Sequence, residues 1–233
     1  KTPLIVILGP TASGKSELAV KLAKRFNGEI ISADSRQVYK EMDIGTAKSF
    51  PGARSPTSHI PYHLIDIISP NQEFTLAQYK KLALKAIKDI QRRKKLPFLV
   101  GGAGLYIWAV VDNLNIPEVK PNSDLRFEIE KEIQKKGIKK VYQKLLELDP
   151  QAGYFVEPNN PRRIIRALEV CLSTGRPFSK QRKKGQPLFD VLQIGLDLPK
   201  EILEKKIDQR TEKMIKAGLV KENGIQLTGD DFR

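Results

Sequence analysis

Residues 9–16 have the composition and spacing of a loop that binds phosphate groups. They read GPTASGKS, which matches the pattern G-x-x-x-x-G-K-[ST], and they lie between an apolar run and the start of an amphipathic segment. Glycines in such a loop let consecutive main-chain N–H groups point at one anion, and the lysine adds a positive charge. We therefore predict that a diphosphate or triphosphate binds to Gly9, Pro10, Thr11, Ala12, Ser13, Gly14, Lys15 and Ser16, with the Ser16 hydroxyl as a ligand of Mg²⁺.

A carboxylate that could act as a base follows the next apolar run. Asp34 comes just past residues 30–32 and should face the phosphate-binding loop, because open α/β sheets bind ligands at the carboxyl ends of their strands. There it can take a proton from a hydroxyl or amine that attacks a phosphorylated substrate. Ser35 and Gln37 add hydrogen-bonding groups suited to the edge of a nucleobase, although an aspartate in this position can also be a cap or loop residue.

A third segment argues against nucleotide hydrolysis. Hydrolases with this kind of loop normally place an acidic residue after an apolar strand, where it helps to hold Mg²⁺. Here the apolar run 98–100 leads into Gly101 and Gly102 instead. Transfer of a group to an acceptor is therefore favoured over hydrolysis of a triphosphate.

The elements that must position these residues alternate along the chain. Short apolar runs predict strands at residues 4–8, 29–32, 64–68, 98–100 and 191–196. Helical spacing of apolar residues predicts helices at 16–26, at 75–95 with Thr75 as a cap, from about residue 103, and at 200–217. Buried strands that alternate with helices form parallel sheets with right-handed crossovers. We therefore expect an α/β fold with a P-loop NTPase-like parallel sheet core.

Residues 119–186 differ from the rest of the chain in pattern and in charge. Three helices with no strand between them are predicted at 123–136, 138–148 and 161–174. This region holds 16 basic and 8 acidic side chains, whereas residues 187–233 hold 8 and 9. We expect an all-helical insertion at 119–186, a core made of 1–118 and 187–223, and an irregular or truncated end at 224–233.

The charge of the insertion favours a polyanionic partner, because contacts from Lys and Arg to phosphates dominate nucleic-acid affinity. A lysine-rich solvated surface is the alternative. The sharper signal is the sequence RRIIR at 162–166. On a helix, Arg162, Arg163 and Arg166 share one face, while Ile164 and Ile165 can face a core.

Composition limits the remaining possibilities. The 233 residues carry a net charge of +14, and 40% of them are hydrophobic, which suits a globular chain. The apolar run at 4–8 is too short to span a membrane, and Cys171, the single cysteine, excludes internal disulfides. We expect a cytoplasmic monomer with no membrane association.

Five segments, in this order along the chain, carry a family resemblance. They are GPTASGKS at 9–16, ISADSRQVYKEMDIGTAK at 31–48, PYHLIDI at 61–67, LPFLVGGAGLYI at 96–107 and LDP…PNNPRRIIRALEV…TGRPFS within 148–179. With them the chain resembles the tRNA dimethylallyltransferases, also called tRNA isopentenyltransferases, over residues 2–222. The resemblance implies transfer of a dimethylallyl group from dimethylallyl diphosphate to the exocyclic amine of the adenine 3′-adjacent to the anticodon in tRNA. Diphosphate is released, and Mg²⁺ is the cofactor.

The same resemblance implies roles for individual residues. Asp34 matches the general base, Thr11 lies near the reacting centre as a second catalytic residue, and Arg210 matches a further ligand of the diphosphate. The implied contacts with the tRNA anticodon stem-loop are Asp34, Ser35, Arg36, Gln37, Ala103, Arg126, Arg162, Arg163, Ile164, Ile165 and Arg166. Ala103 stands where the family usually has a threonine, and residues 50–58 differ from the family's usual stretch.

Two other functions remain open from the residues alone. A small-molecule or nucleoside kinase shares the loop and the sheet, but a kinase lid is seldom as long or as positive as residues 119–186. A non-catalytic RNA-binding module with a relic loop would keep the charge without the chemistry. Phosphorylation that depends on ATP and needs no tRNA would identify the kinase.

Overall fold

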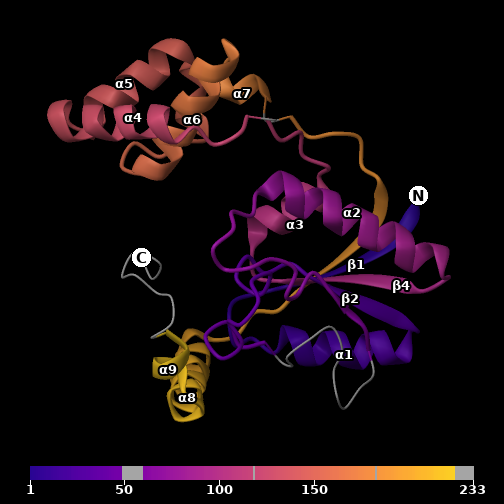
Figure 1. The fold of residues 1–233 in the computed structure, drawn as a ribbon. Coiled ribbons are helices and arrows are strands. Elements are labelled where there is room, and N and C mark those ends of the chain that lie inside the picture. Colours follow the sequence, from indigo (N-terminus) through magenta and orange to yellow (C-terminus); the bar gives the residue numbers. More distant parts are fainter. Residues whose placement is uncertain (49–59, 118, 182, 224–233) are drawn as a thin grey trace. The chain divides into compact units, whose positions relative to one another are not determined.

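The computed structural model describes residues 1–48, 60–117, 119–181 and 183–223. The stretch at 50–58 and the predicted end at 224–233 lie outside these ranges. The chain divides into two compact units, one formed by Lys1–Asn113 with Pro187–Arg233 and the other by Leu114–Gln186. In Figure 1 the first unit contains the strands with helices packed around them, and the second is built from helices.

One parallel sheet organises the first unit, which we call the α/β unit. In the described ranges its strands are β1 Thr2–Leu8, β2 Gly28–Ser32, β3 Tyr62–His63, β4 Leu96–Gly101 and β5 Phe189–Gly195. Their order is β3-β2-β4-β1-β5, and every neighbouring pair is parallel. Parallel strands need crossover connections, and helices lie in those from β1 to β2, from β3 to β4 and from β4 to β5. The predicted α/β class with a parallel sheet is confirmed.

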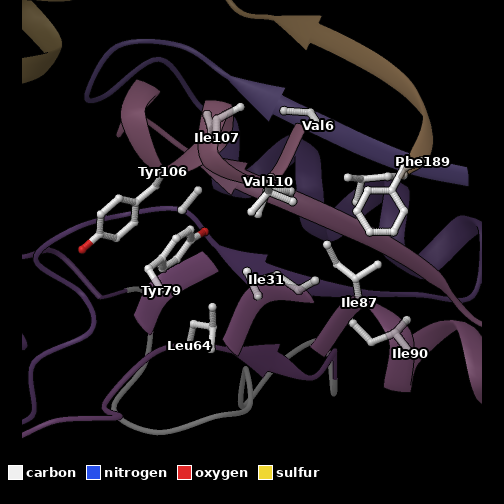
Figure 2. Packing of buried hydrophobic residues seen from close by; sticks show 14 residues of the cluster. Val6, Ile31, Leu64, Tyr79, Ile87, Ile90, Tyr106, Ile107, Val110 and Phe189 are labelled. Atoms are coloured by element: carbon white, nitrogen blue, oxygen red, sulfur yellow. The ribbon is translucent and has the colours of Figure 1, made fainter. Parts of the chain in front are cut away.

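Helices cover both faces of this sheet. The helices of the α/β unit are α1 Lys15–Arg25, α2 Leu76–Arg92, α3 Gly104–Val111, α8 Lys200–Ala217 and α9 Leu219–Asn223. Adjacent strand residues point to opposite faces, so Ile31 packs with Tyr79 and Ile107 of α2 and α3, while Ile30 packs with Ala19 and Ala23 of α1. Figure 2 shows the α2–α3 side, where the stacked rings of Tyr79 and Tyr106 lie 3.9 Å apart between centroids.

Local signals set the start of α2. The Thr75 side chain accepts a hydrogen bond from the Gln78 N–H, and the Gln78 side chain accepts one from the Thr75 N–H, which completes a capping box. Four residues of the apolar stripe are fully buried, namely Tyr79, Ala83, Ile87 and Ile90. The predicted cap and the predicted stripe are both confirmed.

The second unit, which we call the helical unit, contains no strand in its described residues. Its elements are α4 Ser123–Lys136, α5 Ile138–Leu148, the 3₁₀ helix η1 Pro150–Tyr154, α6 Pro161–Thr174 and α7 Phe178–Gln181. The side chains of Asn122 and Asn160 cap α4 and α6, and Gly137 separates α4 from α5. The three longer helices have the predicted bounds, whereas η1 and α7 were not predicted.

The strand predicted at 64–68 is wrong. The structure forms β3 at Tyr62–His63, and the chain then leaves the extended conformation because Leu64 and Asp66 have positive φ angles of 64° and 56°. Residues 66–68 instead donate main-chain hydrogen bonds to the carbonyls of Gln37 and Val38. Within the described ranges, no helix has the length and apolar character that crossing a bilayer requires.

Candidate active site

The loop between β1 and α1 turns tightly at both of its glycines. A Cβ atom on Gly9 would lie 2.6 Å from the carbonyl oxygen of Leu196, which is too close for any side chain. Gly14, directly before α1, has a left-handed φ of 92°. Because the loop ends at the first turn of α1, the unpaired N–H groups of that turn face the loop and create a positive potential suited to an anion.

Two side chains of the loop, Ser13 and Lys15, carry polar groups that could meet phosphate oxygens. The Ser13 hydroxyl is buried and makes no hydrogen bond within the part of the chain that the structure describes. The Lys15 ammonium folds back over the loop and donates a 2.6 Å hydrogen bond to the carbonyl of Pro10. Thr11 and Ser16 are exposed on the same loop. A buried hydroxyl without a partner is uncommon, and it suits a site that binds an oxygen-rich ligand.

Gly101 brings the end of β4 against the segment that carries Asp34. The Ala33 N–H donates to the Val100 carbonyl at 2.7 Å, and the Ala103 N–H donates to the Ala33 carbonyl at 3.1 Å. A Cβ atom on Gly101 would lie 2.0 Å from that same carbonyl oxygen, so only glycine allows this approach. Ala103, at the start of α3, is therefore held beside the Asp34 segment.

Asp34 has one oxygen anchored and one available. Its Oδ1 accepts hydrogen bonds from the N–H groups of Arg36 at 2.8 Å and Gln37 at 3.4 Å. Its Oδ2 has no hydrogen-bond partner among the described residues. The side chains of Ser35 and Arg36 are exposed, and Gln37 is held by Ser32 and by the Thr46 carbonyl. The turn that orients Asp34 thus leaves half of its carboxylate for a ligand.

Electrostatic coupling joins Asp34 to the phosphate-binding loop. Burial lowers the pKa of Lys15, while the charge of Asp34 raises it and the charge of Arg210 lowers it. Burial also lowers the pKa of Arg210, and Asp34 again opposes the shift. Lys15, Asp34 and Arg210 therefore lie within electrostatic reach of one another, although they come from three separate segments.

A cavity of about 610 Å³ opens beside the loop. One wall consists of loop and α1 residues, the second of the segment 43–48, and the third of α8. Its lining includes Gly14, Lys15, Ser16, Lys48, Arg210 and Lys213, but neither Thr11 nor Asp34. The structure thus brings Arg210 to the same cavity as the predicted phosphate ligands, some 195 residues away along the chain.

Sequence reasoning missed Lys48. Its side chain is fully buried, and its ammonium group binds the carboxylates of Asp43 at 2.8 Å and Asp66 at 2.5 Å and the carbonyl of Tyr39 at 2.7 Å. A lysine beside a Pro-, Gly- and Ser-rich stretch is typically solvated, so the residue type did not predict that Lys48 is buried. These contacts tie the segment 43–48 to the body of the α/β unit.

The predicted tRNA contacts in the helical unit fall into two groups. Arg162 and Arg163 are exposed on α6, and Arg163 also pairs with Glu157 at 3.1 Å. The side chains of Ile164 and Ile165 are buried in the core of this unit. The two isoleucines therefore position the arginines on the opposite face and do not present their own side chains to a partner.

Arg126 and Arg166 serve a buried carboxylate. Glu169 is fully buried; it accepts hydrogen bonds from Arg126 Nε at 2.8 Å and Nη2 at 3.0 Å and from Arg166 Nη1 at 2.6 Å. Burial alone would raise the pKa of Glu169, but the bonds from Arg126, the Asn122 N–H and Arg166 lower it. Both arginines thus have a structural role within the helical unit.

Comparison with known proteins agrees with this arrangement. The family model described as IPP transferase matches residues 37–228, and the model described as isopentenyl transferase matches residues 2–62. A tRNA dimethylallyltransferase from Roseiflexus sp. (strain RS-1) is 50% identical over 220 residues, which cover 94% of this chain and 71% of that protein. One from Caldanaerobacter subterraneus subsp. tengcongensis is 46% identical over 224 residues, covering 94% and 70%.

Solved structures lead to the same family. The tRNA isopentenylpyrophosphate transferase from Bacillus halodurans is 40% identical, with a TM-score of 0.63 over 95% of this chain and 69% of that one. A eukaryotic dimethylallyltransferase, in a structure described as acting on tRNA, is 30% identical, with a TM-score of 0.77 over 95% and 55%. The chain belongs to the tRNA dimethylallyltransferase family.

Proposed function

We propose that this chain transfers a dimethylallyl group from dimethylallyl diphosphate to the exocyclic amine of the adenine 3′-adjacent to the anticodon in tRNA. The observation that carries the proposal is that Asp34, whose Oδ2 is available, lies within electrostatic reach of two cations, Lys15 and Arg210, that line one cavity. Membership of the family supports this function over a small-molecule or nucleoside kinase.

The loop and α8 would hold the leaving group. Main-chain N–H groups at the start of α1, the Ser13 hydroxyl and the Lys15 ammonium would bind the diphosphate, and Arg210 would add a second positive charge from α8. Diphosphate becomes a better leaving group when the negative charge that develops on it is neutralised by such preorganised donors. Thr11, exposed on the same loop, would lie toward the reacting carbon.

The residues present suit Mg²⁺ bound chiefly by the substrate. Among the described residues no cluster of three His, Cys, Asp or Glu side chains could hold a metal ion. Mg²⁺ commonly takes few protein ligands and completes its shell with phosphate oxygens and water. The Ser16 hydroxyl, which lines the cavity, would be its protein ligand. When bound, the ion would supply additional neutralisation of the diphosphate charge.

Asp34 would act on the acceptor. The adenine N6 attacks the first carbon of the dimethylallyl group, a C–N bond forms, and the C–O bond to diphosphate breaks with its electron pair going to the diphosphate. Asp34 Oδ2 takes the proton that N6 loses, which an amine of such low basicity requires as it reacts. The N–H groups of Arg36 and Gln37 hold the other oxygen and so keep the carboxylate oriented.

The base must leave its stack to reach this carboxylate. We propose that Ser35, Arg36, Gln37 and Ala103, which surround Asp34, meet the extruded adenine. Arg162 and Arg163, exposed on α6, would contact phosphates of the anticodon stem-loop. A tRNA substrate also supports a cytoplasmic location, and the expected monomer stays a prediction.

Product identification tests the proposal. Anticodon stem-loop RNA is incubated with the chain, dimethylallyl diphosphate and Mg²⁺. The RNA is then digested to nucleosides, and their masses are measured by mass spectrometry. We expect a dimethylallyl-adenosine that requires both substrates, together with released diphosphate. Phosphate transfer from ATP to a small acceptor without RNA would instead identify a kinase, and RNA binding without any product would identify a binding module.

A further inference from the structure

One contact outside the predicted site joins the segment 43–48, a wall of the cavity, to α9, which directly follows the wall formed by α8. Glu222, on α9, accepts hydrogen bonds from three consecutive main-chain N–H groups. Its Oε1 binds those of Asp43 at 2.7 Å and Ile44 at 2.8 Å, and its Oε2 binds that of Gly45 at 2.6 Å. Hydrogen bonds to an ionised carboxylate are among the stronger ones in proteins, and here both oxygens are engaged.

The surroundings allow this close approach. A Cβ atom on Gly45 would lie 3.3 Å from both Glu222 Oε2 and Leu219 Cδ1, so a side chain there would crowd the contact. Gly218 turns the chain from α8 into α9 with a left-handed φ of 105°. Figure 1 shows α8 and α9 as neighbours at the end of the described chain. The turn at Gly218 thus brings Glu222 back toward the segment 43–45.

Glu222 secures α8 through α9, and in the described part of the chain α8 has little apolar packing. No residue of α8 is buried within the part of the chain that the structure describes. Yet α8 carries Arg210 and Lys213, which form one wall of the cavity. A helix without buried side chains gains little from apolar packing, so its position depends on polar contacts such as this one.

The wall formed by the segment 43–48 is held to the body of the α/β unit by ion pairs. Asp43 is bound by Lys48, whose fully buried ammonium also binds Asp66. A continuous set of contacts therefore runs from the body of the α/β unit through Lys48 and the segment 43–45 to Glu222. From Glu222 it continues through α9 into α8 and reaches Arg210.

We propose that Glu222 is a positioning residue that holds α8, and with it Arg210, at the diphosphate cavity by binding the main chain of residues 43–45. This inference rests on the proposed function for the identity of the ligand, dimethylallyl diphosphate. Glu222 itself does not line the cavity. Its removal should therefore weaken the diphosphate site without altering the site for RNA.

Glu222→Gln tests the proposal, because the amide keeps the shape but replaces one accepting oxygen with a donor that faces an N–H group. We expect kcat/KM for dimethylallyl diphosphate to fall about tenfold or more, with KM for the stem-loop RNA unchanged within about twofold. Glu212→Gln, an exposed glutamate on α8, is the matched control and should behave as the unaltered chain.

A double-mutant cycle separates positioning from a general loss of structure. In an Arg210→Ala background, Glu222→Gln should have almost no further effect on kcat/KM, since the residue through which it acts is gone. An equal loss in both backgrounds would overturn the proposal, as would activity of Glu222→Gln equal to that of the control. Should Glu222→Gln fail to fold, Glu222→Asp keeps the charge but shortens the reach by one methylene, and the same results are expected.

Binding of inorganic diphosphate keeps this test independent of the reaction. Titration calorimetry with Mg²⁺ and inorganic diphosphate, without RNA, should show about tenfold weaker binding for Glu222→Gln than for Glu212→Gln. If the chain forms no prenylated RNA but this difference is found, the proposed function fails and the positioning role stands. If prenylation occurs and both variants bind diphosphate equally, the positioning role fails alone.

Discussion

The α/β unit and the helical unit use their charged residues in opposite ways. In the α/β unit, Asp34 has an available oxygen, and Lys15 and Arg210 line a cavity. In the helical unit, the fully buried Glu169 accepts hydrogen bonds from both Arg126 and Arg166. Both regions combine one carboxylate with two cations. We propose that the first set meets a ligand, whereas the second stabilises its own fold.

This difference shows that residue type alone does not separate a binding group from a structural one. All four arginines expected to meet tRNA in the helical unit have the same chemistry, yet two are committed to Glu169 and two are exposed on α6. An arginine can pair with a phosphate or a carboxylate equally well. What distinguishes them is the partner that the fold brings within reach.

The largest effect should come from Asp34→Asn. The amide oxygen can still accept from the Arg36 and Gln37 N–H groups, but it cannot take a proton. We expect single-turnover prenylation to fall about 10²–10⁴-fold, with unfolding temperature and diphosphate binding nearly unchanged. Full activity in this variant would contradict both the role of Asp34 and the contrast with Glu169.

Glu169→Gln should give the opposite result. It leaves two arginine side chains with a weaker partner inside the helical unit, and we expect a loss of about 2 kcal/mol in the stability of that unit. Faster hydrogen exchange of the α4 and α6 amides would report this loss of stability. The α1 and β1 amides, which belong to the α/β unit, should keep their protection and serve as the reference. An unchanged exchange rate in α4 and α6 would show that this buried carboxylate is not needed for the fold.

Glu29 sharpens the comparison within the α/β unit. It is 1% exposed; burial alone would raise its pKa, but hydrogen bonds from Arg93, Lys95 and His63 lower it to about 2. A folded pKa below the unfolded value means that the stabilisation is present above the unfolded pKa of about 4.5 and is lost as the pH falls from there toward about 2.

Glu29→Gln tests this pH dependence. Urea unfolding of the unaltered chain and of the variant should differ by about 2–3 kcal/mol near pH 6, and the difference should shrink between pH 4.5 and 2. A difference that stays constant over this interval would mean that the ion pairs contribute no pH-dependent stability.

The smallest effect should come from the exposed arginines of α6. Arg162→Ala should weaken binding of the stem-loop RNA by a few-fold and reduce the slope of log K against log salt by about 1. Filter binding over a range of salt concentrations measures both. Lys139→Ala, an exposed cation on α5, is the control for loss of charge alone. Equal effects of the two variants would argue against a specific contact at α6.

Local patterns predicted much of the fold. The helices at 123–136, 138–148 and 161–174 have the predicted bounds because apolar spacing, Asn caps and Gly137 act within a few residues of each other. The prediction of a strand at 64–68 was wrong because the conformation of this segment depends on contacts that are not local. Its apolar residues suit a strand, but the turn that pairs it with Gln37 and Val38 depends on residues far away in the sequence.

The conformation of the loop 9–16 between β1 and α1 is what the sequence by itself determined about this protein, since its predicted phosphate-binding role follows from the order of eight neighbouring residues and the strand and helix that flank them. Only the tertiary structure decided which distant groups join it. Arg210 and Lys48 line the cavity with the loop, and Glu222 binds the segment 43–45 across 179 residues of sequence. A charged side chain has many possible partners along the chain, and folding selects one by bringing it within hydrogen-bonding distance.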